Sequence, residues 1–307
     1  MTMDLFRTQV RAEGARLYRD LPWRRTRDPY EIWLSEVMLQ QTQVPRVESR
    51  WPAWLEQFPS VFALAEAPVA EVLAAWQGMG YNRRALALKA AAEEVVRSYD
   101  GVFPRETEAL VALPGIGPAT AQGIRAFAFD LPGVYLETNV RTVFLHHFFP
   151  EVPSVPDREL IPLVSSTCPT LTHLGSDPKH VNSSGETFAE PQDAEDTPRS
   201  WYYALLDYGA HLKKTVPNPS RRSKAYVRQS KFEGSRRQKR AEVVRILLDA
   251  QAADEGAVST DEVSVRLDAV EMAAGREAVE RELVVSILGD LSREGFCREV
   301  DGGWRIA

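Results

Sequence analysis

The segment from Leu113 to Ala121, which reads L-P-G-I-G-P-A-T-A, constrains the fold of this chain more than any other feature. It lies between two helical patterns. Its two glycines, Gly115 and Gly117, allow a tight turn and the close approach of another backbone, because they lack a Cβ atom. The amides that open the next helix then face outward, where the positive end of the helix favours an anion such as a phosphate of DNA. The alternative is an ordinary glycine-containing turn between helices.

Helical patterns dominate the chain on both sides of this segment. Asp28 is predicted to cap a helix that begins at Pro29, with Glu31 three positions after the cap. Alternation of polar and apolar residues is nearly absent, so the expected fold class is mostly α. Val134–Glu137 is expected to be a short extended connector. Further helices are expected over residues 68–76, 83–98, 106–113, 139–149 and 201–212.

The tail from Ser235 is expected to form a separate unit, which divides the chain into domains 1–234 and 235–307. Helices are predicted over 237–250, from the capping box at Ser259, and over 277–294. A hairpin is predicted around Asp301-Gly302-Gly303. Three helices and a hairpin are typical of a winged helix-turn-helix, which binds DNA or serves as a protein-interaction module. Residues 167–200, rich in Ser, Thr, Pro and acidic residues, are expected to be a flexible insertion.

Charge is concentrated in one part of the chain. Residues 211–240 hold eleven lysines and arginines but one acid, Glu233, so the segment carries a net charge of +10. Because the whole chain carries −6, the remainder carries −16. A concentrated basic stretch can follow phosphates even when the total is acidic. The alternative is a solvated linker between domains.

The composition excludes several classes of protein. No apolar run approaches the ~18 residues that span a bilayer, and Met1–Arg11 lacks a signal-peptide core, so we expect a cytoplasmic protein with no membrane partner. The chain has two cysteines, Cys168 and Cys297. Two are too few for a disulfide framework, an all-cysteine zinc site or a four-cysteine iron–sulfur cluster, so we expect no metal and no cofactor.

Four segments carry a resemblance to a known family. They read L-P-W-R at 21–24, S-E-V-M-L-Q-Q-T-Q-V at 35–44, G-M-G-Y at 78–81 and A-L-L-D-Y-G-A at 204–210. Together with the glycine hairpin, they resemble the helix-hairpin-helix DNA glycosylases, and within them the adenine DNA glycosylases of the MutY type. The resemblance covers roughly residues 15–215 apart from the insertion. It implies excision of adenine opposite 8-oxoguanine or G in double-stranded DNA, by a monomer.

Cleavage of an N-glycosidic bond requires an acid for the leaving base and a negative charge for the developing sugar cation. Glu36 lies in an almost wholly apolar helical segment, where desolvation raises the pKa of a carboxyl group. The alternative for Glu36 is a solvent-facing position. The resemblance makes Glu36 the acid that protonates the purine, Glu137 the second carboxylate and Asn139 its support. Glu137 stands where the family has Asp, and otherwise would be an acid at a helix start.

Other positions acquire roles through the same resemblance. Glycosylases that also act as lyases carry Lys where this chain has Ala119, so the resemblance implies a monofunctional enzyme that leaves an abasic site. Tyr203 replaces a Glu or Gln that often contacts adenine, and Asn82 replaces a wedge tyrosine. The implied base pocket comprises Trp23, Arg24, Leu39, Val44, Tyr203 and Leu206. The implied DNA contacts comprise Gln40, Gln41, Tyr81, Asn82, Gly115, Gly117, Ala119 and Thr120.

The chain departs from the family after Ala210. The four-cysteine loop is missing there, and Lys213 stands near its first cysteine. Cations of the basic segment are expected to contact phosphates in its place, namely Arg221, Arg222, Lys224 and Arg236. The hairpin could hold a monovalent cation. The winged-helix-like tail stands where the family carries its 8-oxoguanine-reading domain.

Two other functions remain open at this point. One is a glycosylase of the same superfamily for a different mispaired or damaged base, which the departures at Asn82, Glu137 and Tyr203 favour. The other is a catalytically silent DNA-binding protein that uses the hairpin and the tail. The retention of Glu36 and Glu137 disfavours the silent protein, and the run from 35 to 44 disfavours another base.

Overall fold

The structure is a computed structural model that describes residues 1–170, 196–228 and 231–307. The chain folds into two compact units. Unit one consists of Met1–Glu36, Pro104–Ala112 and Ile116–Val227, and unit two of Val37–Phe103, Leu113–Gly115 and Arg228–Ala307. Most of the predicted insertion, residues 171–195, lies outside the described residues. The first and last residues of the predicted insertion 167–200 are helical, because Thr167 ends one helix and Pro198 begins the next.

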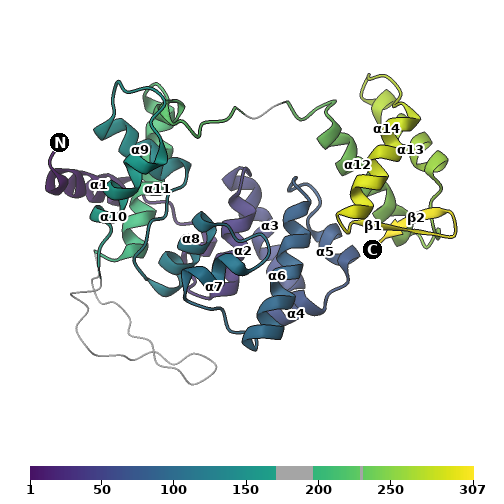
Figure 1. The fold of residues 1–307 in the computed structure, drawn as a ribbon, viewed down its shortest axis with the longest axis horizontal. Coiled ribbons are helices and arrows are strands. Elements are labelled where there is room, and N and C mark those ends of the chain that lie inside the picture. Colours follow the sequence, from purple (N-terminus) through teal and green to yellow (C-terminus); the bar gives the residue numbers. More distant parts are fainter. Residues whose placement is uncertain (171–195, 229–230) are drawn as a thin grey trace. The chain divides into compact units, whose positions relative to one another are not determined.

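Unit one is a group of helices around an aromatic core. Figure 1 shows α1, α9 and α11 side by side. Phe6 of α1 lies at their centre, with its ring centroid 5.0 Å from that of Phe144 and 6.2 Å from that of Trp201. The helices of unit one are α1 (Met3–Leu17), α2 (Pro29–Leu39, whose last three residues belong to unit two), α7 (Thr107–Ala112), α8 (Pro118–Phe129), α9 (Thr138–Phe148), α10 (Asp157–Thr167), α11 (Pro198–Thr215) and two short 3-10 helices, Pro22–Arg24 and Pro219–Arg222.

The start of α2 confirms the prediction for Asp28. Its Oδ1 accepts hydrogen bonds from the amides of Tyr30 (2.8 Å) and Glu31 (3.3 Å), and Pro29 is the first helical residue. Such a cap satisfies amide groups that a helix start leaves without partners. The cap therefore fixes where α2 begins, and with it the register of Glu36 two turns later.

Unit two combines a second helical group with the chain's tail. Trp54 of α3 and Trp76 pack with their ring centroids 5.5 Å apart, beside α4, α5 and α6. Its elements are α3 (Val44–Gln57), α4 (Val61–Glu66), α5 (Val69–Ala75), α6 (Arg83–Tyr99), α12 (Arg236–Ala252), α13 (Thr260–Ala273), α14 (Arg281–Arg293), β1 (Cys297–Val300) and β2 (Gly303–Ile306).

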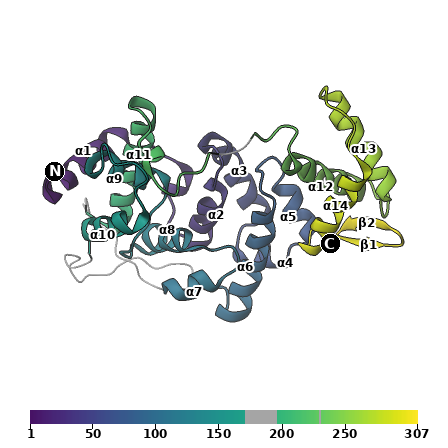
Figure 2. The ribbon, with the colours of Figure 1, turned by 45° about the horizontal axis from the view of Figure 1, so that its top comes forward.

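The tail contains the predicted elements in the predicted order. Ser235 and Ser259 cap α12 and α13, and β1 pairs antiparallel with β2, the hairpin that Figure 2 shows beside α14. Asp301 and Gly302 form its two-residue turn with φ of +50° and +77°, as a type I′ turn requires. The prediction that α14 begins at Glu277 is wrong by four residues. The winged-helix assignment and the domain boundary at Ser235 stay predictions.

The expected fold class is confirmed, since the described chain is mostly α-helical with one two-stranded sheet. In the part of the chain that the structure describes, no helix has the length and apolar character needed to cross a membrane.

Candidate active site

Glu36 lies near the end of α2 in unit one, where Trp33, Leu34 and Ser35 are almost fully buried. The carboxyl group itself is half-buried, and its Oε2 accepts a hydrogen bond of 3.0 Å from the hydroxyl of Tyr135. Desolvation raises the pKa of Glu36 to about 8, an effect that the Tyr135 bond opposes and the charge of Glu137 reinforces. Glu36 therefore holds a proton at neutral pH.

Gly123 of α8 faces the same carboxyl group. A Cβ atom at this position would overlap Oε2 of Glu36 and come within 3.0 Å of the Tyr135 ring. The absence of a side chain in the middle of α8 therefore makes room for Glu36. Glycine costs about 1 kcal/mol relative to alanine inside a helix, so its presence here indicates a packing requirement.

We expect Gly123→Ala to lower the single-turnover rate of the base excision that the resemblance implies by about tenfold or more, because the new methyl group displaces Glu36, the expected acid. Gel-shift titration should show duplex affinity close to that of the parent. Tyr135→Phe is the matched control. It removes a bond that lowers the pKa of Glu36, so the acid stays protonated at neutral pH and excision persists. Parental excision by Gly123→Ala would contradict this geometry.

Glu137 is the N-cap of α9. Its Oε1 accepts hydrogen bonds from the amides of Asn139 (2.5 Å) and Val140 (3.0 Å). Burial raises the pKa of Glu137, while these amides and the cations Lys213 and Arg141 favour the ionised form. In the described part of the molecule, no hydrogen bond engages the second oxygen, Oε2. Glu137 thus performs the helix-start role through Oε1, and its Oε2 has no hydrogen bond among the described residues.

Asn139 follows at the start of α9. Its Oδ1 is buried, and no group among the described residues hydrogen-bonds to it. The backbone of Asn139 touches Gly209 of α11 so closely that a Cβ atom on Gly209 would overlap the carbonyl oxygen of Asn139. The contact between α9 and α11 therefore sets the position of both Glu137 and Asn139.

Lys213 lies one helical turn beyond Gly209, so both residues face the same side of α11. Burial lowers the pKa of Lys213, and the charge of Glu137 opposes this effect. Lys213 thus supplies a positive charge on the side of α11 that faces the start of α9. The sequence placed Lys213 near a missing cysteine, and the structure adds this electrostatic relation to Glu137.

Tyr203, predicted in the base pocket, has its ring enclosed by protein. The ring stacks on Phe127 at 4.5 Å and 6°, and the guanidinium of Arg24 lies 4.3 Å from its centroid. Its hydroxyl is buried with no partner among the described residues, and burial raises the pKa of Tyr203 to about 12. A base therefore cannot stack on this ring, whereas the hydroxyl can donate a hydrogen bond.

Arg24, also predicted in the pocket, is engaged by the protein. Its two terminal nitrogens pair with the carboxylate of Asp207 at 2.7 and 2.8 Å, and Arg19 adds a third bond to that carboxylate at 2.6 Å. Both side chains of the Arg24–Asp207 pair are almost fully buried, so the loss of either would strand a charge. Trp23, the residue before Arg24, is buried. Leu206, the residue before Asp207, is half-buried.

The remaining predicted contacts at the end of α2 belong to unit two. Leu39 and Val44 are half-buried, and Gln41 is exposed with a φ of +56°. Arg84 of α6 binds this turn, since it donates to the carbonyl of Gln40 at 2.6 Å. A left-handed, non-glycine residue costs free energy and is concentrated at functional sites. The turn is thus held in a strained shape with Gln41 at its exposed tip.

The glycine hairpin differs from its prediction at one position. Gly115 has a φ of +73°, and a Cβ atom there would lie 2.6 Å from that of Ala87 in α6, which confirms the tight turn and the close approach. Gly117, the N-cap of α8, has a φ of −83° that any residue adopts, so its predicted turning role is wrong. Nothing lies within 4 Å of its missing side chain, and Ala119 is also exposed, whereas Thr120 is buried. The start of α8 is thus open to a ligand.

Of the four basic residues that were predicted to contact phosphates, two are bound by other groups of the protein. Arg221 and Lys224 are exposed. Arg222 donates to a backbone carbonyl of α9 at 3.0 Å, and Arg236 donates to Asp290 at 2.5 Å. Ion pairs within the chain therefore neutralise part of the basic segment's positive charge.

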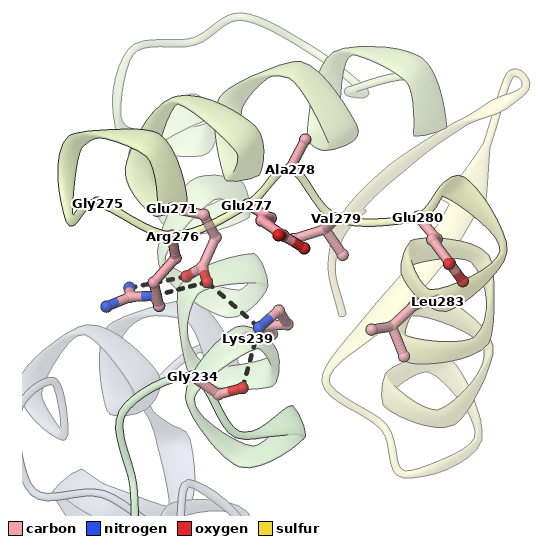
Figure 3. Close-up of a pocket in the computed structure, with 10 residues that line it drawn as sticks. All are labelled: Gly234, Lys239, Glu271, Gly275, Arg276, Glu277, Ala278, Val279, Glu280 and Leu283. Atoms are coloured by element: carbon pink, nitrogen blue, oxygen red, sulfur yellow. Dashed lines mark hydrogen bonds and ion pairs between the residues drawn. The ribbon is translucent and has the colours of Figure 1, made fainter.

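A hollow of about 400 Å³ lies in the tail between α12, α13 and α14 (Figure 3). Its cations are paired, because the fully buried Glu271 accepts from Arg276 at 2.7 Å and lies 3.2 Å from Lys239. Gln238 adds a third bond to Glu271 at 3.0 Å. This cluster joins α12 to α13. Among the described residues, no three His, Cys, Asp or Glu side chains gather as a metal site.

Three residues of the site escaped the sequence analysis as contributors to it: Tyr135, Gly123 and Gly209. Tyr135 lies 99 positions from Glu36 in the sequence, so no local pattern connects them. The two glycines carried a detectable signal, since each lies within a helix where glycine is unfavourable. Such a position indicates close packing but does not identify the partner.

Comparison with known proteins gives this geometry a context. Residues 34–159 match the family model described as HhH-GPD superfamily base excision DNA repair protein. An adenine DNA glycosylase of Mycolicibacterium smegmatis is 48% identical over 126 residues, which are 41% of this chain and 43% of that protein. One of Mycobacterium tuberculosis is 42% identical over 137 residues, or 44% and 45% of the two chains. The chain thus matches less than half the length of these relatives.

A solved structure also shares the fold. The structure of a thermostable thymine-DNA glycosylase superposes with a TM-score of 0.53 at 22% identity, over 68% of this chain and 86% of the other. The match to the HhH-GPD family model, over residues 34–159, includes Glu36, Gly123, Glu137 and Asn139. Over residues 34–159, this chain is therefore similar to the HhH-GPD superfamily of base excision DNA repair proteins.

Proposed function

We propose that the protein is a DNA glycosylase that removes a mispaired adenine, opposite 8-oxoguanine or G, from double-stranded DNA. The observation that carries this proposal is the pair of half-buried carboxyl groups in unit one. Glu36 has a pKa of about 8, and Glu137 is held by two amides and favoured in its ionised form by Lys213. Two carboxyl groups in different environments can divide acid and charge-stabilising roles. The identity of the mycobacterial relatives as adenine DNA glycosylases supports adenine as the base.

The reaction follows from these two groups. Glu36 donates its proton to the extruded adenine while the bond between C1′ and the base breaks, and the bonding electrons leave with the base. Glu137 stabilises the positive charge that develops on the sugar, through the oxygen that does not cap α9. A water molecule then adds to C1′ and loses its proton through Glu137 to solvent. Ala119 has no amine that could attack the sugar, so the product is an abasic site.

Duplex DNA is the partner that the exposed groups of unit one fit. The open start of α8 at Gly117 presents backbone amides, and Arg221 and Lys224 are exposed. These features suit phosphate groups. The Kd for duplex DNA should therefore rise with salt concentration. If log Kd does not depend on log salt concentration, the basic segment is a linker and does not contact phosphates.

The rate of excision should fall as the pH rises through about 8, because Glu36 must be protonated to act as the acid. Single-turnover rates between pH 5.5 and 9.5 test this expectation. The desolvation that raises the pKa of Glu36 predicts a descending limb well above the ordinary glutamate range near ~4.3. A rate that climbs through pH 8 would remove Glu36 from the acid role.

Labelled duplexes separate this proposal from its alternatives. They would contain A opposite 8-oxoguanine, A opposite G, or T or U opposite G, and would be treated with alkali after incubation. Breaks at adenine that need alkali support a monofunctional adenine glycosylase. Breaks confined to a pyrimidine show a glycosylase for another base, and binding without cleavage shows a silent DNA-binding protein. Purified protein should be colourless if it holds no iron–sulfur cluster.

A further inference from the structure

Within unit two, the first turn of α12 contacts the loop between α5 and α6. Arg237 donates a hydrogen bond of 2.8 Å to the hydroxyl of Tyr81, and its guanidinium lies 5.0 Å from the centroid of the Tyr81 ring. The ring of Phe232 lies 5.3 Å from the same guanidinium. A planar guanidinium can bind two aromatic groups at once, which an ammonium group does less well. Tyr81 is thus held by a residue of the tail.

Tyr81 has a strained backbone that needs such support. Its φ of +49° lies in the left-handed region, which is unfavourable for an aromatic residue. Arg84 supports the same loop from α6, through bonds of 2.9 Å to the carbonyl of Met79 and 3.0 Å to that of Gly80. Arg84 also binds the carbonyl of Gln40. Arg84 therefore joins the Tyr81 loop to the Gln40 turn, both expected to contact the duplex, and Arg237 from the tail binds Tyr81 itself.

The neighbouring cations of α12 are paired with carboxylates. Arg240 binds Glu294 at 2.5 Å, and Glu294 also accepts from Arg83 at the start of α6, at 2.7 Å. Arg236 pairs with Asp290. These ion pairs fix α12 and α14 against the start of α6, directly after the Tyr81 loop. Arg237 lies between Arg236 and Arg240 in the first turns of α12, and it binds the hydroxyl and ring of Tyr81.

We propose that Arg237 is a positioning residue that holds the Tyr81 ring ready for insertion beside the mispair, so that the tail determines specificity by bracing this loop. This inference rests on the proposed function. In this proposal Arg237 fixes the Tyr81 hydroxyl and with it the orientation of the ring, so loss of Arg237 should lower discrimination between mispaired and matched duplexes. A phosphate contact by Arg237 would instead weaken binding to all duplexes alike.

The test uses the full chain with Arg237→Ala, Arg237→Lys, Tyr81→Phe and the double variant Arg237→Ala/Tyr81→Phe. Discrimination is the ratio of Kd values for a matched duplex and one with A opposite 8-oxoguanine. Insertion is read from the fluorescence of 2-aminopurine next to the mispair, with Glu36→Gln in every protein so that no base is removed. We expect Arg237→Ala and Tyr81→Phe each to lower discrimination about fivefold, and the double variant to do no worse, since residues that act together are not additive.

Arg237→Lys should behave like Arg237→Ala, and neither should change the salt dependence of Kd. Arg298→Ala, at an exposed position in β1, is the matched control and should leave both readouts unchanged. Additive losses, rescue by Lys, or a salt slope reduced by about one would each overturn the positioning role. Coupling between Arg237 and Tyr81 without adenine excision by the parent would refute the proposed function alone. Excision with additive losses would refute this inference alone.

Discussion

Replacement of Glu36 by Gln should lower the single-turnover rate of adenine excision by about 100-fold to 10,000-fold, the range that a general acid contributes. The amide has nearly the shape of the carboxyl group and can still accept from Tyr135, but it has no proton to donate at neutral pH. Duplex affinity, measured by fluorescence anisotropy, should stay close to that of the parent. Undiminished turnover would show that another group protonates the base.

The same variant should be more stable than the parent at neutral and alkaline pH. Because the folded pKa of about 8 lies above the ordinary value, the unfavourable burial of charge begins above pH ~4.5 and is complete above about 8. A neutral amide avoids this penalty. Thermal unfolding at pH 5 and pH 9 should therefore show a difference in Tm between variant and parent that grows with pH. Loss of activity together with gain of stability is the pattern expected of a catalytic group.

Gly209→Ala should have the second largest effect. Its Cβ atom would overlap the backbone carbonyl of Asn139, and backbone cannot rotate away as a side chain can. Overpacking of this kind costs about 1–3 kcal/mol in the free energy of unfolding. It also displaces the start of α9, which carries Glu137 and Asn139, so excision should fall at least tenfold even in the folded fraction, because a small misplacement of catalytic groups is costly. Chemical denaturation and active-site titration measure the two effects separately.

Gly289→Ala provides the matched control for this substitution. Gly289 lies within α14, and no atom lies within 4 Å of the position that its Cβ would occupy. The same chemical change should therefore stabilise the protein by up to about 1 kcal/mol, through helix propensity, and leave excision unchanged. Equal effects of the two substitutions would show that the contact between α9 and α11 has no special role.

Local features of the sequence predicted local structure well. Asp28 and Ser259 cap helices through bonds to amides two or three residues away, and Asp301-Gly302 forms a turn whose conformation these residue types adopt readily. Each of these features depends on a few neighbouring residues. The mostly helical fold and the resemblance to the helix-hairpin-helix glycosylases were accessible for the same reason, since both depend on contiguous patterns.

The environment of each site residue was less accessible. The sequence placed Tyr203 at the base pocket, but its ring faces Phe127 and Arg24, and the Arg24 guanidinium is bound to Asp207, 183 positions away. These contacts depend on how helices pack, which periodicity does not determine. The prediction for Gly117 failed for a different reason. Its residue type suggested a turn, but its backbone adopts a conformation that any residue can take.

The Glu271 cluster keeps α12 linked to α13 over the pH range in which catalysis would be titrated. Its bonds from Arg276, Gln238 and Lys239 lower the pKa of Glu271 to about 2. The stabilisation from this group is complete above the unfolded value near ~4.5 and is lost only as the pH falls from there through about 2. Acidification to pH 5.5 therefore leaves the link between α12 and α13 intact. The link between α12 and α13 is therefore a constant background for rates measured across that window.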